Sequence, residues 1–137
     1  MHEDQFTINP QMLAHPGKRY QGQFIDGLIT LVLFALCMYL IKALSLQSVV
    51  TDIIVLLVPA LYFVLSDALP GGQSLGKRLL GMYVVSKSTG KPCTVIQSVA
   101  RNVLTPILGV IDAIMILGSS RQRLGDLMAN TVVLKNN

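Results

Sequence analysis

An arginine and an aspartate seven residues apart stand at the start of the first apolar run of the chain. Arg19 and Asp26 are followed by uncharged residues from position 27 to position 41. Seven residues are close to two helical turns, so on a helix both side chains lie on one face, about 10 Å apart along the axis. Gln23 and Thr30 share this face. A carboxylate near the end of an apolar helix costs free energy and usually has a function. This polar stripe is therefore the first candidate ion or proton site.

A similar set occurs in the third apolar run. Arg101, Thr105 and Asp112 follow one another at spacings of four and seven residues, which again places an arginine, a hydroxyl and a carboxylate on one helical face. The residues around Asp26 and Asp112 look alike, but the likeness covers too few positions to indicate an internal repeat. Two interpretations stay open. The arginines and aspartates form an ion or proton pathway, or each aspartate pairs with an arginine of another helix and holds the bundle in register.

The composition indicates an integral membrane protein. Of 137 residues 52% are hydrophobic and 13% are charged, whereas a soluble domain has about 25% charged residues. We expect one domain over residues 1–137, without room for a separate soluble catalytic domain. No nucleophile–base pair and no metal-ligand spacing is visible, so we predict no enzyme activity, no catalytic residue, no cofactor and no metal.

The net charge of +4 does not indicate a nucleic-acid partner, because the basic residues alternate with apolar runs and the chain has no tryptophan. The predicted partner of this charge is the bilayer, with its anionic lipid headgroups.

Two segments have the length and apolarity of transmembrane helices, residues 23–44 and 49–69. Each has about 20 residues, which suffices to cross hydrocarbon about 30 Å thick. The short link between them predicts an antiparallel hairpin. Asp52 and Asp67 are expected to mark the two ends of the second helix at the membrane interface. Residues 1–18 form a polar tail without the features of a cleaved signal peptide.

A basic, turn-rich loop follows, over residues 70–101. By the positive-inside rule this loop and the N-terminus both lie in the cytoplasm, which agrees with two crossings. Within the loop, residues 82–86 alternate as a short strand. It can pair with the strand-like residues 131–134 in the C-terminal segment, 121–137, to form a ribbon with an edge open to further pairing.

The third apolar segment, residues 102–120, is short for a span and contains Pro106 and Gly109. If it crossed, Arg121 and Arg123 would lie outside, against the charge rule. We favour a re-entrant or surface-lying helix and leave a crossing open. The predicted fold class is therefore an all-α integral membrane protein. It has two transmembrane helices as a hairpin, a third short or re-entrant hydrophobic helix, and a small cytoplasmic two-stranded β ribbon.

Three motifs carry a family resemblance. The first is the pair Arg19 and Asp26. The second, at 76–85, reads Gly-Lys-Arg-Leu-Leu-Gly-Met-Tyr-Val-Val, and the third, at 122–133, reads Gln-Arg-Leu-Gly-Asp-Leu-Met-Ala-Asn-Thr-Val-Val. In these motifs the chain resembles the RDD family of small bacterial membrane proteins, named for one arginine and two aspartates. Asn130 stands where the family has glycine, and asparagine tolerates the same left-handed backbone. The resemblance makes Asp126 the second named aspartate. It adds gate or motif candidates: Gly76, Lys77, Gly81, Arg123 and Gly125.

The resemblance implies transport across the bacterial cytoplasmic (inner) membrane, with cation/proton antiport proposed for some members. We expect a membrane transport protein and, as the specific hypothesis, monovalent cation/proton antiport through intramembrane aspartates. Asp26 would carry the ion and Arg19 would tune its pKa. The alternative is a non-enzymatic membrane adaptor or assembly factor for a larger membrane complex. About three helices cannot enclose a sealed pathway, so a homo-oligomer or a larger partner is expected.

Overall fold

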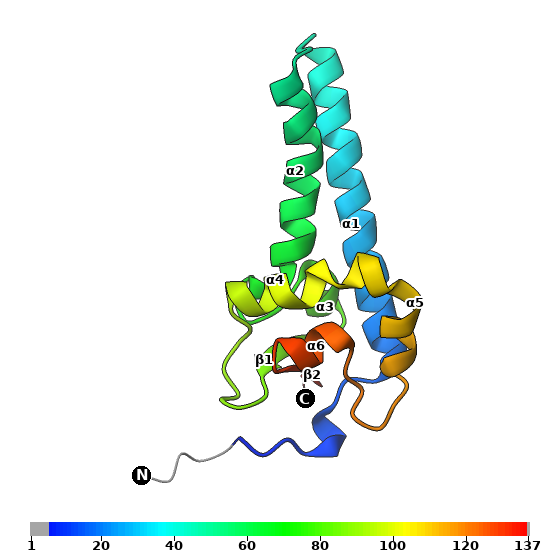
Figure 1. Cartoon of the computed structure of the whole chain (residues 1–137), viewed down its shortest axis with the longest axis vertical. Coiled ribbons are helices and arrows are strands. Elements are labelled where there is room, and N and C mark those ends of the chain that lie inside the picture. Colours follow the sequence, from blue (N-terminus) through cyan, green and yellow to red (C-terminus); the bar gives the residue numbers. More distant parts are fainter. Residues whose placement is uncertain (1–5, 137) are drawn as a thin grey trace.

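A long helical hairpin rises from a compact base in the computed structural model, which describes residues 6–136 (Figure 1). The hairpin consists of α1 (Pro16–Ala43) and α2 (Val49–Leu65), and the 3₁₀ turn η2 (Ser66–Ala68) extends α2. We call the base, residues 6–26 and 66–136, the head. Both helices are long and apolar enough to cross a membrane, over Pro16–Ala43 and Val49–Ala68. This confirms the predicted hairpin. Residues 1–5 of the predicted tail lie outside the described residues.

Local signals set the helix boundaries. At α1, Pro16 occupies the first turn and the His15 Nδ1 accepts from the Gly17 amide at 3.1 Å. The helix therefore begins seven residues before the predicted position 23, and its first turns belong to the head. At α2, Ser48 and Thr51 form a reciprocal capping box.

The third apolar segment is two helices, α4 (Val95–Val103) and α5 (Thr105–Met115), bent by 85°. In Figure 1, α4 runs across the foot of the hairpin and α5 turns away from it. The predicted boundary at residue 102 is wrong, because a capping box between Thr94 and Gln97 starts the helix earlier, inside the expected loop. Pro106 follows the bend, where a helix cannot continue straight. A bent pair fits a re-entrant segment, and by length and composition it also fits one broken span.

The predicted ribbon is confirmed. Strands β1 (Met82–Ser86) and β2 (Thr131–Lys135) pair antiparallel, with Val84 opposite Val133 at the centre. The outer edges of the ribbon are covered, however, so the expectation of an edge open to further pairing was wrong. On one side the N-terminal segment covers β2 through a bridge from Leu13 to Leu134, and on the other Pro92 bridges Val85. Both edges are closed because the segments that flank the first helix and α4 return along the ribbon.

An internal repeat lies around this ribbon. Each strand follows a five-residue helix, α3 (Leu75–Leu79) before β1 and α6 (Leu124–Met128) before β2. Each element of the second unit begins 49 residues after its counterpart, at Leu124 against Leu75 and at Thr131 against Met82. The equivalent linkers both contain a positive φ, 64° at Gly81 and 51° at Asn130. Val84 and Val133, which pair at the centre of the ribbon, are also 49 residues apart and so occupy equivalent positions. The two helix–strand units are therefore related by an approximate twofold axis through this pair. This correspondence is separate from the likeness around Asp26 and Asp112.

Each short helix carries a glycine against the backbone of a longer helix. A Cβ on Gly76 would clash with the Gly22 carbonyl of α1 and lie 3.0 Å from the Asp26 Cγ. A Cβ on Gly125 would clash with the Arg101 carbonyl of α4 and lie 2.9 Å from its Cα. These two motif glycines are therefore where α3 and α6 dock.

Substitution of either glycine by alanine should destabilise the protein. In Gly76→Ala and Gly125→Ala the added methyl group meets backbone, which cannot rotate away, so we expect a loss of about 1–3 kcal/mol. Gly27→Ala is the matched control, since a Cβ there has no neighbour within 4 Å. That change should be neutral or gain about 0.5–1 kcal/mol of helix stability. Thermal unfolding in detergent, followed by circular dichroism, measures all three. Equal midpoints would contradict the docking role.

Candidate functional site

Eight charged side chains lie buried together in the head. None exposes more than 8% of its surface. They come from the foot of the hairpin, from both short helices and from the α4–α5 pair. The set contains four carboxylates and four cations, so with all groups ionised its net charge is zero. We call it the ion cluster: Asp26, Asp67, Asp112, Asp126, Arg19, Lys77, Arg101 and Arg123.

Asp126 has the most cationic surroundings in the ion cluster. Its Oδ2 lies 2.6 Å from the Arg19 Nη2, and its Oδ1 lies 3.1 Å from the Arg101 Nη2 and 3.7 Å from the Arg123 Nε. The Arg123 backbone amide also donates to Oδ2, at 3.1 Å. Burial alone would raise the pKa of Asp126, but the guanidinium groups of Arg101, Arg19 and Arg123 hold it well below its usual range. These contacts favour the ionised form of Asp126.

Asp67 is a second anchor, at the end of the hairpin. Its Oδ1 lies 2.6 Å from the Lys77 Nζ and its Oδ2 lies 3.3 Å from the Arg101 Nε. Asn102 donates to the same Oδ2 at 3.4 Å. Burial lowers the pKa of Lys77, and the neighbouring Asp67 opposes this effect. The expectation that Asp67 is an interfacial end-marker was wrong, because the side chain is fully buried.

Asp26 is held by neutral donors and one more distant cation. It accepts from the Ser74 hydroxyl, from the Gly76 amide at 2.8 Å and from the Tyr62 hydroxyl at 3.1 Å. The Lys77 Nζ lies 3.9 Å away. Both carboxylate oxygens are therefore occupied, and Asp26 ties α1 to α2 and α3.

Arg19 does not pair with Asp26, contrary to the tuning role expected for it. Its guanidinium reaches Asp126 and the Arg121 carbonyl instead. About two helical turns separate Arg19 from Asp26 along α1, which exceeds the length of an ion pair. The two motif residues on one helix therefore serve different parts of the ion cluster.

Asp112 differs from the other three carboxylates. Its Oδ1 accepts from the Leu124 amide at 2.9 Å. Its Oδ2 is buried and, like the Asp126 Oδ1, finds no hydrogen-bond donor among the described residues, but it lacks the close cation that the Asp126 Oδ1 has at 3.1 Å. The nearest cation, the Arg123 Nε, is 3.7 Å away. A buried oxygen without a donor is costly, so this atom is a candidate for binding something else.

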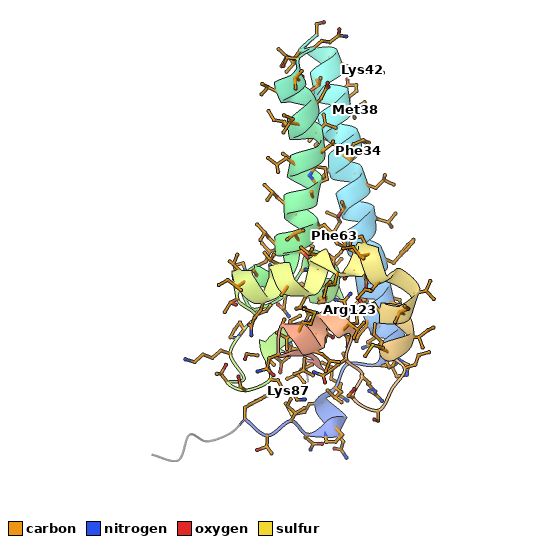
Figure 2. The ribbon with its side chains drawn as sticks, in the orientation of Figure 1. Phe34, Met38, Lys42, Phe63, Lys87 and Arg123 are labelled. Atoms are coloured by element: carbon orange, nitrogen blue, oxygen red, sulfur yellow. The ribbon has the colours of Figure 1, made fainter. Side chains whose placement is uncertain are left out.

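A cavity of about 220 Å³ adjoins this carboxylate. Arg123 spans it, because its Nη1 donates to the Gln23 Oε1 at 2.9 Å and to the Thr105 Oγ1 at 3.4 Å. Figure 2 shows Arg123 inside the head, below α4. The helix that lines the cavity is irregular, with φ 34° and ψ −98° at Gly109. The lining consists of Tyr20, Gln23, Thr105, Gly109, Asp112, Ala113, Ile116 and Arg123.

All five residues predicted as ion or proton ligands belong to the ion cluster: Asp26, Arg19, Asp112, Arg101 and Asp126. Of the gate or motif candidates, Lys77 and Arg123 join it. Gly76 and Gly125 support it, while Gly81 provides the turn before β1. Sequence reasoning missed Asp67 as a member. The signal was its place at the end of an apolar run, ten residues before Lys77.

Metal chemistry finds no support in the donor set. Within residues 6–136 no group of three or more histidine, cysteine or acidic side chains is arranged to hold a metal ion. Arginine and lysine side chains surround the carboxylates instead.

The fold and site define a class of small helical protein with a membrane-type hairpin over a buried, charge-neutral ion cluster. The profile of the RDD family matches residues 13–130, and the chain belongs to this family. This confirms the resemblance seen in the motifs. No curated protein and no solved structure matched the chain. Two of the three residues that give the family its name, Arg19 and Asp126, form the 2.6 Å ion pair.

Removal of the Asp126 charge should be severely destabilising. Asp126→Asn leaves Arg19, Arg101 and Arg123 without their shared anion, and breaking a buried ion pair in this way costs about 3–5 kcal/mol. Asp52→Asn is the control, because Asp52 is exposed at the far end of the hairpin. There we expect a change within about 0.5 kcal/mol. Chemical unfolding in detergent measures both, and similar losses would contradict a structural ion cluster.

Acid should reduce the difference between wild type and Asp126→Asn. The pKa of Asp126 is lowered in the folded state, so its stabilising effect is full above its unfolded pKa, about 3.9. That effect declines as the pH falls towards the folded value. Unfolding midpoints of the two proteins, measured from pH 7 downwards, should stay apart until about pH 4 and then converge. A constant difference over this range would contradict the assignment.

Proposed function

We propose that this protein is a membrane transport protein that exchanges a monovalent cation for protons, with Asp112 as the exchanging carboxylate. The observation that carries the proposal is the buried Asp112 Oδ2 beside a cavity, without a hydrogen-bond donor among the described residues. A buried carboxylate oxygen without a donor is costly, and a bound ligand that supplies positive charge relieves that cost. Competition of a proton and a cation for this oxygen couples their movements.

The other three carboxylates suit this role less well. Asp67 and Asp126 each contact two or more cations at close range. Asp26, the residue expected to carry the ion, already accepts hydrogen bonds from three donors. A carrier must gain and release its ligand, and these contacts would have to break each time. At the Asp112 Oδ2 only the 3.7 Å contact with the Arg123 Nε would have to change.

Arg123 is placed to respond to occupancy of Asp112. Its Nε lies 3.7 Å from the Asp112 Oδ2 and also 3.7 Å from the Asp126 Oδ1. Neutralisation of Asp112 by a proton or a cation removes one of these two attractions. The guanidinium then moves towards Asp126, which opens the cavity to the cluster. This movement gives the two states that transport requires.

The surrounding backbone supports transport as well. The 85° bend between α4 and α5 and the irregular Gly109 lie beside the cavity. Broken helices at membrane depth occur where they line a cavity or pack against protein. We place the protein in the bacterial cytoplasmic membrane with the basic head and N-terminus in the cytoplasm. Because two long helices do not enclose a pathway, the active form is a homo-oligomer.

The adaptor hypothesis had three grounds: the small size of the chain, its few polar intramembrane residues and an open ribbon edge. The third ground is lost, because both edges of the ribbon are covered.

The flux experiment uses purified protein in proteoliposomes with a pH-sensitive dye inside. Sodium, lithium or potassium is added outside in turn. Wild type should show cation-dependent proton flux, and Asp112→Asn should lose it, because an amide neither titrates nor carries charge. Asp52→Asn is matched in chemistry, lies far from the cavity, and should retain wild-type flux.

Retained flux in Asp112→Asn would contradict the carboxylate assignment. Absence of flux from folded, inserted wild type with all three cations would contradict cation/proton exchange altogether and favour the adaptor. Arg123→Lys tests the proposed movement of the Arg123 side chain. Lysine keeps the positive charge but cannot contact Asp112 and Asp126 at the same time, as the guanidinium does. We expect slower flux with unchanged ion preference.

A further inference from the structure

Helices α4 and α5 expose a continuous apolar face. On α4, Val95, Val99 and Val103 repeat every four residues on the outside, and Ile96 beside them is 81% exposed. The opposite face points inwards and carries Ser98, Arg101 and Asn102, all buried. On α5 the outward residues are Ile107, Val110, Ile111 and Ile114, while Thr105 and Asp112 are buried. We call this outward surface the α4–α5 face.

The charged surface of the head has one sign. All four of its carboxylate side chains, within the described residues 6–26 and 66–136, are buried in the ion cluster. The remaining cations are at least partly exposed: Lys18, Arg78, Lys87, Lys91, Arg121 and Lys135. Asp52, the one exposed acidic residue described, lies at the opposite end of the hairpin. In Figure 2, Lys42 lies at the hairpin tip and Lys87 lies in the head, towards the opposite end of the molecule.

We propose that the α4–α5 face lies in the interfacial plane of the bilayer and that the adjoining cations of the head bind anionic lipid headgroups. The occupant is a lipid surface because the face is continuous with the apolar hairpin: α4 crosses its foot in Figure 1. A helix with one strongly polar and one apolar face, beside basic residues, has the character of an interfacial helix. An exposed cation beside this face, such as Lys91 four residues before α4, complements anionic lipids.

The interfacial position of the α4–α5 face is independent of transport. It concerns the depth of the third apolar segment in the membrane, which the flux assay does not measure. A second copy of the chain or another protein would instead cover the same face without lipid contact, and the experiment separates these outcomes.

The absence of tryptophan from the chain allows single-tryptophan depth measurements. Ile96→Trp and Val110→Trp probe the α4–α5 face, Leu36→Trp in the middle of α1 marks the hydrocarbon centre, and exposed Gln11→Trp marks the aqueous side. Each full-length variant is reconstituted in vesicles of phosphatidylcholine and phosphatidylglycerol. The lipids carry bromine either near the headgroup end or near the terminal end of the acyl chains.

Shallow bromine should quench the two face variants more than deep bromine does, and Leu36→Trp should show the reverse order. Gln11→Trp should be quenched by neither. Quenching of Ile96→Trp mainly by deep bromine, as for Leu36→Trp, would overturn the proposal in favour of a broken span. No quenching, as for Gln11→Trp, would overturn it in favour of a protein partner or an aqueous face.

The charge component is tested with bromine on one lipid class at a time. Ile96→Trp should be quenched more by brominated phosphatidylglycerol than by brominated phosphatidylcholine in the same mixture. Each contacting cation should enrich the anionic lipid about fivefold at low salt. Lys91→Gln, four residues before α4, and Arg78→Gln, beside the exposed Leu79, should reduce the preference, and so should high salt. Lys42→Gln at the hairpin tip is the matched control. Equal quenching by both lipid classes in the parent variant would overturn the headgroup assignment.

Discussion

The guanidinium of Arg101 is the point on which the rest of the structure depends. It is fully buried and lies between the carboxylates of Asp67 and Asp126, at 3.3 Å and 3.1 Å. A buried arginine without a carboxylate partner would carry uncompensated charge, at a cost of about 3–5 kcal/mol. Arg101 has two such partners, one from the end of the hairpin and one from α6. Its guanidinium therefore joins three segments that are far apart in the sequence.

Charge neutrality of the ion cluster has consequences at its edges. Because its four carboxylates and four cations balance, a change of protonation or ligand at one member leaves an excess charge in a medium of low polarity. Only small movements of buried side chains can compensate for that excess. Asp112 is the member least tied to others, and Arg123 joins it to Asp126. Arg123 therefore links the cavity to the helix that docks at Gly125.

The distribution of polar and apolar residues in the head is the reverse of that in a soluble protein. Ion pairs occupy the interior, and valine, isoleucine and leucine side chains cover α4 and α5. Such an arrangement is stable where hydrocarbon replaces water on the outside. The small ribbon has an ordinary apolar core, with Met82, Val84 and Val133 buried against Ala14. It closes the head on the side away from the hairpin. The repeat of helix and strand around the ribbon explains how so short a chain supplies two docking glycines and two central valines.

The sequence by itself determined the elements that depend on local pattern. Runs of apolar residues defined the hairpin, since the length needed to cross hydrocarbon is a property of one segment. Alternation defined both strands, and the motifs defined the family and most members of the ion cluster. Capping residues are also local signals. The start of α4 at Val95 was nevertheless missed, because its capping box lies in a polar stretch that was assigned to the loop.

Tertiary structure alone decided which charges pair. Arg19 and Asp26 share a helix face, but Arg19 pairs with Asp126, 107 residues away, because ion pairing needs contact at about 3 Å rather than a common face. Asp67 looked like a helix end until Lys77 and Arg101 were placed beside it. The unpaired oxygen of Asp112 and its cavity likewise arise only where α1, α5 and the start of α6 meet. These features depend on long-range packing, and no periodicity along the chain encodes them.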